Sequence, residues 1–184
     1  MSWTEEQGRL ALERMQQRAS CRSFSEEDIP EEVLKSVLET GIRAASGGNL
    51  QPYSIIVVRD KEKRKKLAEL NEQVFVLAWY KNGRLAKIQK APYTAPKGYL
   101  HFLIGAEDVM CAAQTIETAA WLMGIGSVYI GTSNYVGKEL AALLDLPEHT
   151  YPIVILSMGY PKRELKKRDR LPYELTVFEE GYPP

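Results

Sequence analysis

Apolar side chains near the start of the chain recur at the spacing of one helix face. Leu10 and Met15 belong to this pattern, and Thr4 and Gln7 precede it, three residues apart, as a capping box. We therefore predict a first helix over about residues 4–17.

A second amphipathic pattern begins at Pro30, a residue type that is tolerated in the first turn of a helix. Two glutamates follow it and suit the positive end of the helix dipole. The apolar stripe of this second predicted helix consists of Val33, Leu34, Val37, Leu38 and Ile42. The acidic residues here thus have a local role in starting the helix.

Three further segments are expected to be helical. Residues 60–70 predict a charged, solvated helix, residues 106–126 a long Ala-rich helix, and residues 137–146 a short helix closed by the following proline. Within the segment 106–126, Gly124 is expected to terminate the long helix. Its predicted buried stripe is Met110, Ala113, Ile116, Ala120 and Met123.

Strands are predicted between these helices. The β-branched run at residues 55–58 predicts one buried strand, and residues 127–131 and 151–159 predict two more. Residues 74–80, "VFVLAWY", suit a strand or a helix equally. Because helices separate the strands, we expect an α/β or α+β sandwich with helices covering a small sheet.

Length and charge narrow the class of protein. A chain of 184 residues, 45% of them hydrophobic, is expected to bury roughly 70% of its unfolded surface in one compact domain. Its 24 basic and 24 acidic side chains cancel, so it lacks the overall field of a nucleic-acid binder. We therefore expect no nucleic-acid partner.

Cysteines and apolar runs suggest a cytoplasmic protein. Cys21 and Cys111 lie outside any CxxC pattern, so we expect two buried or half-buried thiols rather than a disulfide or a zinc site. No apolar stretch approaches the roughly 20 residues that span a bilayer, and the first residues lack a signal-peptide pattern. A soluble protein with no membrane partner is expected.

Candidate binding chemistry begins at "RASCRSF", residues 18–24. In an extended segment Arg18, Ser20 and Arg22 point the same way and present two guanidinium groups and a hydroxyl to one anion. That anion is either a phosphate or the carboxylates of the acidic residues that follow.

A basic tail offers further anion-binding groups. "PKRELKKRDRLP", residues 161–172, holds six basic and two acidic residues immediately after a predicted strand. Arg168 and Arg170 could join Arg18 and Arg22 around one phosphate, because guanidinium forks match its oxygens. The alternative is a solvated tail that binds nothing.

The loop "SGGNLQP", residues 46–52, suits a planar heterocycle, because its glycines permit close approach of the backbone. Alternatively it is only a turn; it lacks the pattern of a phosphate-binding P-loop. His101 and His149 have no partners at metal-ligand spacing, and no hydrolase motif occurs. We therefore predict no metal site and no catalytic side chain, and expect an organic cofactor to carry any chemistry.

Four segments together resemble the nitroreductase family of flavoproteins. "RASCRSF" is similar to its Arg-x-Ser-x-Arg-x-Phe motif, and "ASGGNLQPY" to its Pro-Ser-Ser-x-Asn-x-Gln-Pro-Trp motif. The Ala-rich helix with its following strand, and the basic ending "GYPKRELKKRDRLP", occur in the family's order. The resemblance spans nearly the whole chain.

This resemblance implies an FMN-binding α+β homodimer with the flavin at the subunit interface. The implied fold is a three-layer α-β-α sandwich, with helices around a small, mainly antiparallel sheet, and residues 1–184 as a single domain with a basic C-terminal tail. The implied cofactor-binding residues are Arg18, Ala19 and Ser20 with Arg168 and Arg170 at the phosphate or ribityl, Arg22 at the pyrimidine edge, Ser46, Gly47 and Asn49 from the partner subunit, and Ile130 and Gly131 against the ring.

The implied activity passes hydride from NADH or NADPH through FMN to a nitroaromatic, a quinone or a similar small acceptor in a ping-pong cycle. Such a cycle needs no obligatory protein acid or base. Two other readings of the same resemblance are reductive dehalogenation or flavin fragmentation, and a flavin-binding regulatory protein without turnover.

Overall fold

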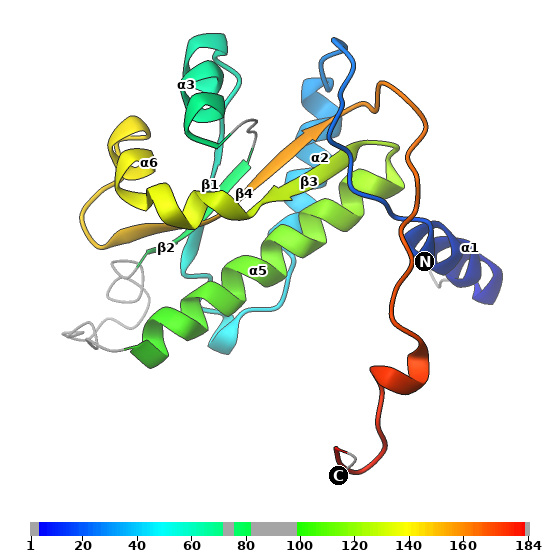
Figure 1. Cartoon of the computed structure of the whole chain (residues 1–184). Helices are drawn as coiled ribbons and strands as arrows, with labels where there is room; N and C mark the ends of the chain where they lie inside the picture. Colours follow the sequence, from blue (N-terminus) through cyan, green and yellow to red (C-terminus); the bar gives the residue numbers. More distant parts are fainter. Residues whose placement is uncertain (1–3, 72–75, 82–98, 183–184) are drawn as a thin grey trace.

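A four-stranded antiparallel sheet lies at the centre of the computed structural model, which describes residues 4–71, 76–81 and 99–182. Its strand order is β1-β2-β4-β3, and each neighbouring pair is antiparallel. The strands are β1 (Tyr53–Val57), β2 (Val76–Lys81), β3 (Gly126–Ile130) and β4 (Thr150–Gly159) (Figure 1).

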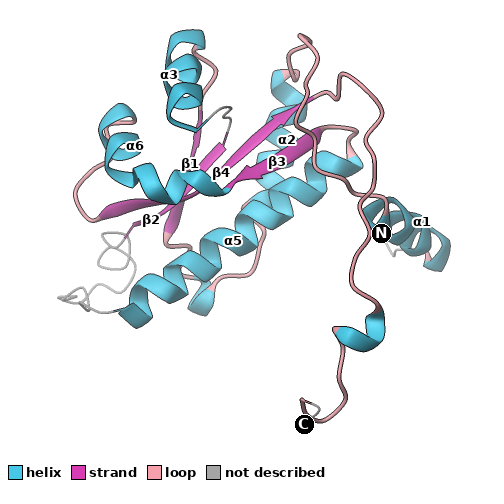
Figure 2. Cartoon of the chain, viewed as in Figure 1, coloured by secondary structure: helices cyan, strands magenta, loops and turns pink. Residues whose placement is uncertain are grey.

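Helices cover both faces of this sheet (Figure 2). The long helix α5 (Tyr99–Leu122) and α2 (Glu31–Gly41) pack against one face, while α3 (Lys61–Asn71) and α6 (Gly137–Leu143) pack against the other. The structure thus has the expected α+β class and its three layers.

Strand β4 contributes side chains to the apolar cores on both faces of the sheet. Leu156 and Met158 pack with α2 and α5, whereas Ile155, which directly precedes Leu156, packs with α3 and α6. Successive side chains of a strand point to opposite faces, so an almost continuous apolar run suits a strand that is covered on both sides. The burial of β4 therefore follows directly from its sequence.

Helix α1 (Glu5–Gln16) contributes little to these cores, because none of its residues is buried. Its start confirms the predicted capping box: the Gln7 amide donates to Thr4 Oγ1 at 3.2 Å, and the Thr4 amide donates to Gln7 Oε1 at 3.0 Å. Leu10, Leu12 and Met15 of this helix are exposed. Its apolar side chains therefore face water in the single chain.

Helix α5 differs in part from its prediction. It begins at Tyr99 rather than at residue 106, and ends near Gly124, whose φ of 79° confirms the predicted terminator. Ala113, Ile116 and Ala120 are buried as predicted. The expected burial of Met110 and Met123 is wrong: they are 40% and 54% exposed, because the buried stripe runs through Val109 and Ala112 instead.

The segment left open between strand and helix contains strand β2, which pairs with β1 and β4. Residues 74 and 75 of that segment, like 72–73 and 82–98 around it, lie outside the described part of the chain. Cys21 is buried as expected, but the expectation for Cys111 is wrong: on α5 it is exposed. Its position is off the buried stripe of the helix.

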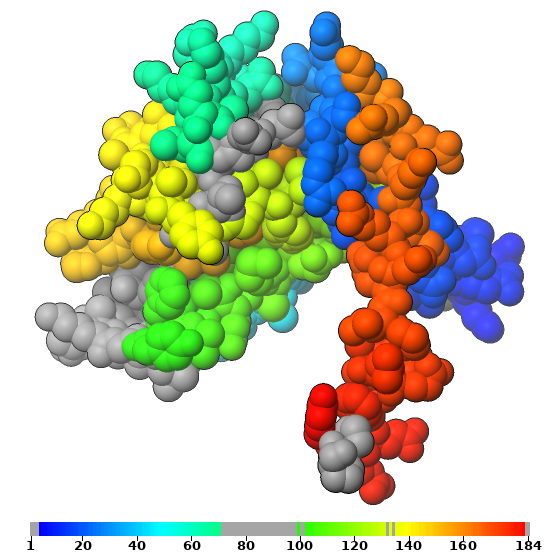
Figure 3. Space-filling model, viewed as in Figure 1, coloured from blue at the N-terminus to red at the C-terminus, as the bar shows by residue number. Residues whose placement is uncertain are grey.

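Residues 160–182, after β4, form an extended, mostly exposed tail that includes the short turn η3 (Tyr173–Leu175). Figure 3 shows it reaching away from the sheet and its covering helices. Leu171, Leu175, Val177 and Phe178 are exposed along it. The tail is thus polar near β4 and partly apolar further on.

Candidate functional site

The N-terminal segment, α5 and the basic tail enclose a cavity of about 730 Å³. This volume lies within the range of about 300–1,000 Å³ that is typical of small-molecule sites. The tail contributes Lys167, Arg168, Asp169 and Arg170, and α5 contributes Gln114, Glu117, Thr118 and Trp121; Met15, Gln16 and Arg18 complete the wall.

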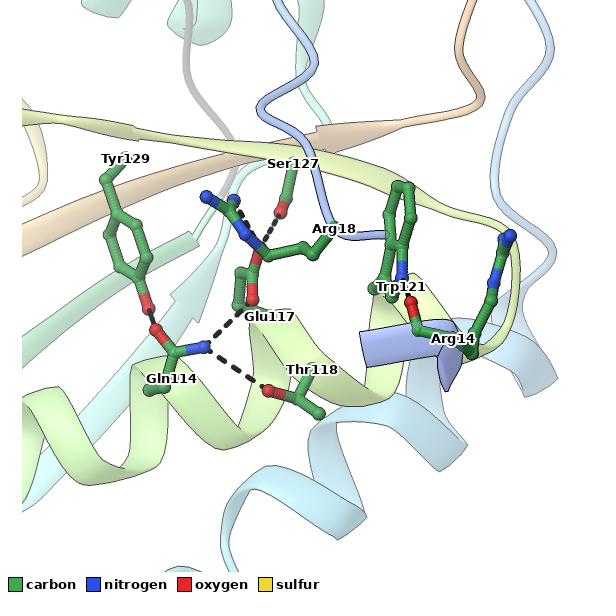
Figure 4. A network of polar contacts seen from close by, with 8 residues as sticks. All are labelled: Arg14, Arg18, Gln114, Glu117, Thr118, Trp121, Ser127 and Tyr129. Carbon is green, nitrogen blue, oxygen red and sulfur yellow. Dashed lines mark hydrogen bonds and ion pairs between the residues drawn. The ribbon is translucent and has the colours of Figure 1, made fainter. Parts of the chain in front are cut away.

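Glu117 is the centre of a polar network beside this cavity (Figure 4). Its side chain is only 1% exposed, and its Oε1 accepts hydrogen bonds from Arg18 Nη1 at 2.8 Å and from Ser127 Oγ at 3.1 Å. Its other oxygen accepts from Gln114 Nε2 at 2.9 Å. A buried carboxylate without such partners would be very costly, so these contacts explain why it is tolerated.

The segment before Cys21 is held beside β3. The Cys21 amide donates to the Ser127 carbonyl at 2.8 Å, and Ser20 forms a parallel bridge with Ser127. A Cβ on Gly126 would overlap the Cys21 side chain, so the close approach of the two segments requires glycine there. This pairing places Arg18 over α5.

A second contact fixes the end of α1 near the same cavity. The Trp121 indole Nε1 donates to the Arg14 carbonyl at 2.6 Å, and the Arg14 guanidinium lies 4.6 Å from the ring centroid. Both residues are drawn in Figure 4. The cation–π contact and the hydrogen bond together connect α1 to α5.

The charges around the cavity favour an anion. Four cationic side chains and two carboxylates line it, an excess of two positive charges. Arg18 has one nitrogen engaged with Glu117 while its side chain still lines the cavity. A guanidinium carries five N–H donors, so it can hold Glu117 and a second anion at the same time.

Three of the predicted site residues meet in this cavity: Arg18, Arg168 and Arg170. Arg18 lies about 150 positions before the two tail arginines, so only the fold brings them together. The carboxylate that Arg18 binds is Glu117, not one of the acidic residues just after the motif. Arg170 Nη1 donates to the carbonyls of Arg168 and Asp169, both at 3.3 Å.

The neighbours of Arg18 differ in exposure. Ala19 is buried, Ser20 is half-buried in its bridge to β3, and Arg22 is exposed and does not line the cavity. Arg18 and Arg22 were expected to face one anion, but in the single chain only Arg18 lines the cavity.

Ser46, Gly47 and Asn49 lie apart from the cavity, in the loop between α2 and β1 that includes the turn η1 (Gly47–Asn49). The Gly47 amide donates to the carboxylate of Asp108 on α5, and Ser46 Oγ accepts from the Gln51 amide. The Gly47 amide and the Ser46 hydroxyl are therefore both hydrogen-bonded within the chain.

Ile130 and Gly131 lie where β3 passes into the turn η2 (Gly131–Val136). Ser133 Oγ donates to the Ile130 carbonyl at 2.8 Å and secures this turn. A Cβ added to Gly131 would meet nothing within 4 Å, so the space over this glycine is open. A flat ligand can approach the backbone here.

The sequence prediction missed Glu117, its partners Gln114 and Ser127, and the cavity residues Trp121 and Lys167. A signal was present: Glu117 is the single charged residue between positions 108 and 138. A lone charge in an apolar helix indicates a buried, paired group. Its partner could not be inferred, because Arg18 is 99 positions away.

The network also affects Tyr129 on β3, whose hydroxyl donates to Gln114 Oε1 at 3.4 Å. Burial raises the pKa of Tyr129 well above its usual value, the charge of Glu117 raises it further, and Arg18 opposes both. The phenol therefore stays protonated at neutral pH and acts as a hydrogen-bond donor.

Neither a metal site nor a membrane span is found in the described part of the chain. Residues 4–71, 76–81 and 99–182 contain no group of three or more His, Cys, Asp or Glu side chains that could hold a metal ion. None of the helices there combines the length and apolar character that crossing a bilayer requires.

The α+β sandwich and the cationic cavity beside α5 favour a protein that binds a small anionic molecule, and comparison with known proteins gives its family. The model of the "Nitroreductase family" matches residues 15–160. This chain belongs to the nitroreductase family. Its sequence is 32% identical over 175 residues to FMN reductase [NAD(P)H] of Bacillus subtilis, covering 89% of this chain and 70% of that protein.

Solved structures agree. B. megaterium NfrA2 has a TM-score of 0.88 at 32% identity, with 94% of this chain and 75% of that chain covered. The NADPH:FMN oxidoreductase from Vibrio harveyi complexed with NAD+ has a TM-score of 0.87 at 30% identity, with coverages of 95% and 78%. These likenesses confirm the family resemblance and the fold class.

The buried ion pair yields a stability prediction. We expect Glu117→Ala to lower the free energy of unfolding by about 3–5 kcal/mol, because half-buried Arg18 loses its counter-ion and buried Ser127 loses its acceptor. Urea denaturation followed by circular dichroism measures this. Glu107→Ala, which removes an exposed carboxylate from the same helix, should change it by no more than about 0.5 kcal/mol. Equal effects of the two substitutions would contradict the prediction.

Proposed function

We propose that this protein is an FMN-dependent oxidoreductase that takes electrons from NADH or NADPH and passes them to a small acceptor such as a nitroaromatic or a quinone. The observation that carries the proposal is the convergence of Arg18, Arg168 and Arg170 on one cavity in a member of the nitroreductase family. Two of the relatives named above, from Bacillus subtilis and Vibrio harveyi, are by name an NAD(P)H-dependent FMN reductase and an NADPH:FMN oxidoreductase.

The residues present suit FMN. The phosphate of FMN carries close to two negative charges near pH 7, and the cavity lining has an excess of two positive charges. Arg168 and Arg170 come from an exposed tail, while Arg18 is fixed by Glu117. We assign Arg18, Ser20, Arg168 and Arg170 to the phosphate or ribityl, with Ala19 in the same segment.

The ring end of the cofactor is assigned to other residues. We assign Ile130 and Gly131, where the backbone is open to a flat ligand, to one side of the ring, and Ser46, Gly47 and Asn49 of a second subunit to the other. Arg22 is assigned to the pyrimidine edge, where a guanidinium stabilises negative charge. FMN, when bound, supplies the hydride chemistry, so the protein needs no acid or base of its own.

A homodimer with the cofactor at its interface is part of this proposal. Apolar side chains are exposed on α1 and at the end of α5, and more follow along the tail: Leu10, Leu12, Met15, Leu122, Met123, Leu171, Leu175, Val177 and Phe178. So much exposed apolar surface is unusual for a chain that stays alone in water. A second copy would cover it and bring its own Ser46–Asn49 loop to the ring.

Sedimentation equilibrium tests the dimer. The FMN-loaded protein should have twice the mass of the 20.8 kDa chain. A monomer that binds FMN tightly would overturn the assignment of loop residues to a partner, because one chain holds this loop apart from the cavity.

Turnover is tested by anaerobic reduction. Protein loaded with FMN should be yellow, and NADH or NADPH should bleach its visible absorbance; adding a quinone or a nitroaromatic should then restore the colour. Bound flavin that neither nucleotide reduces would instead favour a regulatory flavin-binding protein. Failure to take up FMN at all would contradict both functions.

The phosphate assignment is tested with two flavins. We expect Arg168→Ala to weaken FMN binding to the apoprotein by a factor of about 10–100, because a hydrogen bond to a charged group is lost. Riboflavin, which lacks the phosphate, should bind as before. Lys162→Ala removes a tail cation that does not line the cavity and serves as the control. Equal losses of both flavins in the Arg168 variant would contradict the assignment. Fluorescence quenching measures the affinity of each flavin for the unaltered protein and for both variants.

A further inference from the structure

The loop between α2 and β1 has an unusual backbone. Gly48, Asn49 and Gln51 have φ values of 56°, 56° and 47°, in the left-handed region. Glycine adopts this region easily and Asn less so, whereas Gln does so only under strain. Such a conformation persists only where surrounding contacts hold it. The residues that make those contacts therefore control the shape of the loop.

Contacts within the loop hold it in part. The Gln51 amide donates to Ser46 Oγ at 3.0 Å, and Gln51 Nε2 donates to the carbonyl and the side-chain oxygen of Asn49 at 3.1 and 3.0 Å. These bonds connect residues at most five positions apart. They shape the loop but do not fix its place on the protein.

Asp108 supplies the connection to the rest of the fold. Both of its carboxylate oxygens accept from the Gly47 amide, at 3.0 and 3.3 Å, across 61 positions of sequence. Asp108 is 7% exposed and lies on α5, the helix that also carries Glu117. Since a charged acceptor makes a strong hydrogen bond to a backbone amide, Asp108 ties the loop to the central helix.

We propose that Asp108 is a positioning residue that holds the Ser46–Gln51 loop in the one conformation able to receive the flavin ring. The inference rests on the proposed function, in which this loop contacts the ring. Asp108 itself is buried beneath the loop and acts through Gly47. The Gly47 amide is therefore used to place the loop, and Asn49, which is exposed, is left to meet the ligand.

Binding affinity is the quantity that Asp108 controls. If only a fraction of molecules has the competent loop, the apparent dissociation constant rises by the reciprocal of that fraction. The loop is assigned to the ring, which FMN and riboflavin share. Loss of Asp108 should therefore weaken both flavins by the same factor, unlike loss of a cation at the phosphate.

The test compares two flavins on two substitutions at one position. We expect Asp108→Ala to weaken FMN and riboflavin binding to the dimeric apoprotein equally, by about tenfold or more, since the Gly47 amide loses its charged acceptor. Asp108→Asn keeps an oxygen of the same size and should restore most of the affinity. Glu107→Ala, on the exposed neighbouring position of α5, should bind both flavins like the unaltered protein.

A spectroscopic readout separates positioning from general destabilisation. At saturating FMN, the visible circular dichroism of the bound ring should change in Asp108→Ala and stay unchanged in Glu107→Ala. Asp108→Asn is isosteric and should stay folded. Its loss of affinity should be smaller than that of Asp108→Ala, and again equal for FMN and riboflavin. Unchanged affinity in Asp108→Ala, or a loss confined to FMN in either Asp108 variant, would overturn the inference.

Failure of the proposed function would look different. In that case the unaltered protein itself would take up neither FMN nor riboflavin. If it takes up both, and the Asp108 variants bind them normally, only the role of Asp108 is rejected.

Discussion

The buried carboxylate of Glu117 is the constraint on which the site depends. A charge that is 1% exposed needs donors on every side, and Glu117 obtains them from Arg18, Ser127 and Gln114. These partners belong to the N-terminal segment, to β3 and to α5. One carboxylate thus joins the start of the chain to the sheet and to its central helix, and turns Arg18 toward the cavity.

The same helix organises both halves of the proposed cofactor site. Glu117 on α5 orders the cationic end, and Asp108, on the same helix, holds the loop assigned to the ring. Buried acids in an apolar helix are expensive, so each is expected to have a specific role. Family membership indicates the chemistry, and under the proposed assignment these two contacts prepare the chain to bind FMN.

Local patterns predicted much of this structure. The capping box at Thr4, the terminator at Gly124 and the strand at residues 151–159 depend on neighbouring residues, and the sequence contains their patterns directly. Pairings between distant residues could not be predicted in this way. Arg18 and Glu117 are 99 positions apart, and Gly47 and Asp108 are 61 apart, so only the folded chain reveals them. The motif resemblance singled out Arg18 and Gly47, but not Glu117 and Asp108, the acids to which they are bonded.

The most direct test of the central claim is a crystal structure of the protein loaded with FMN. We expect the phosphate to lie within hydrogen-bonding distance of both Arg18 and Arg168, with Arg18 still bound to Glu117. A phosphate held elsewhere, with these two arginines on separate surfaces and no shared ligand, would contradict the account.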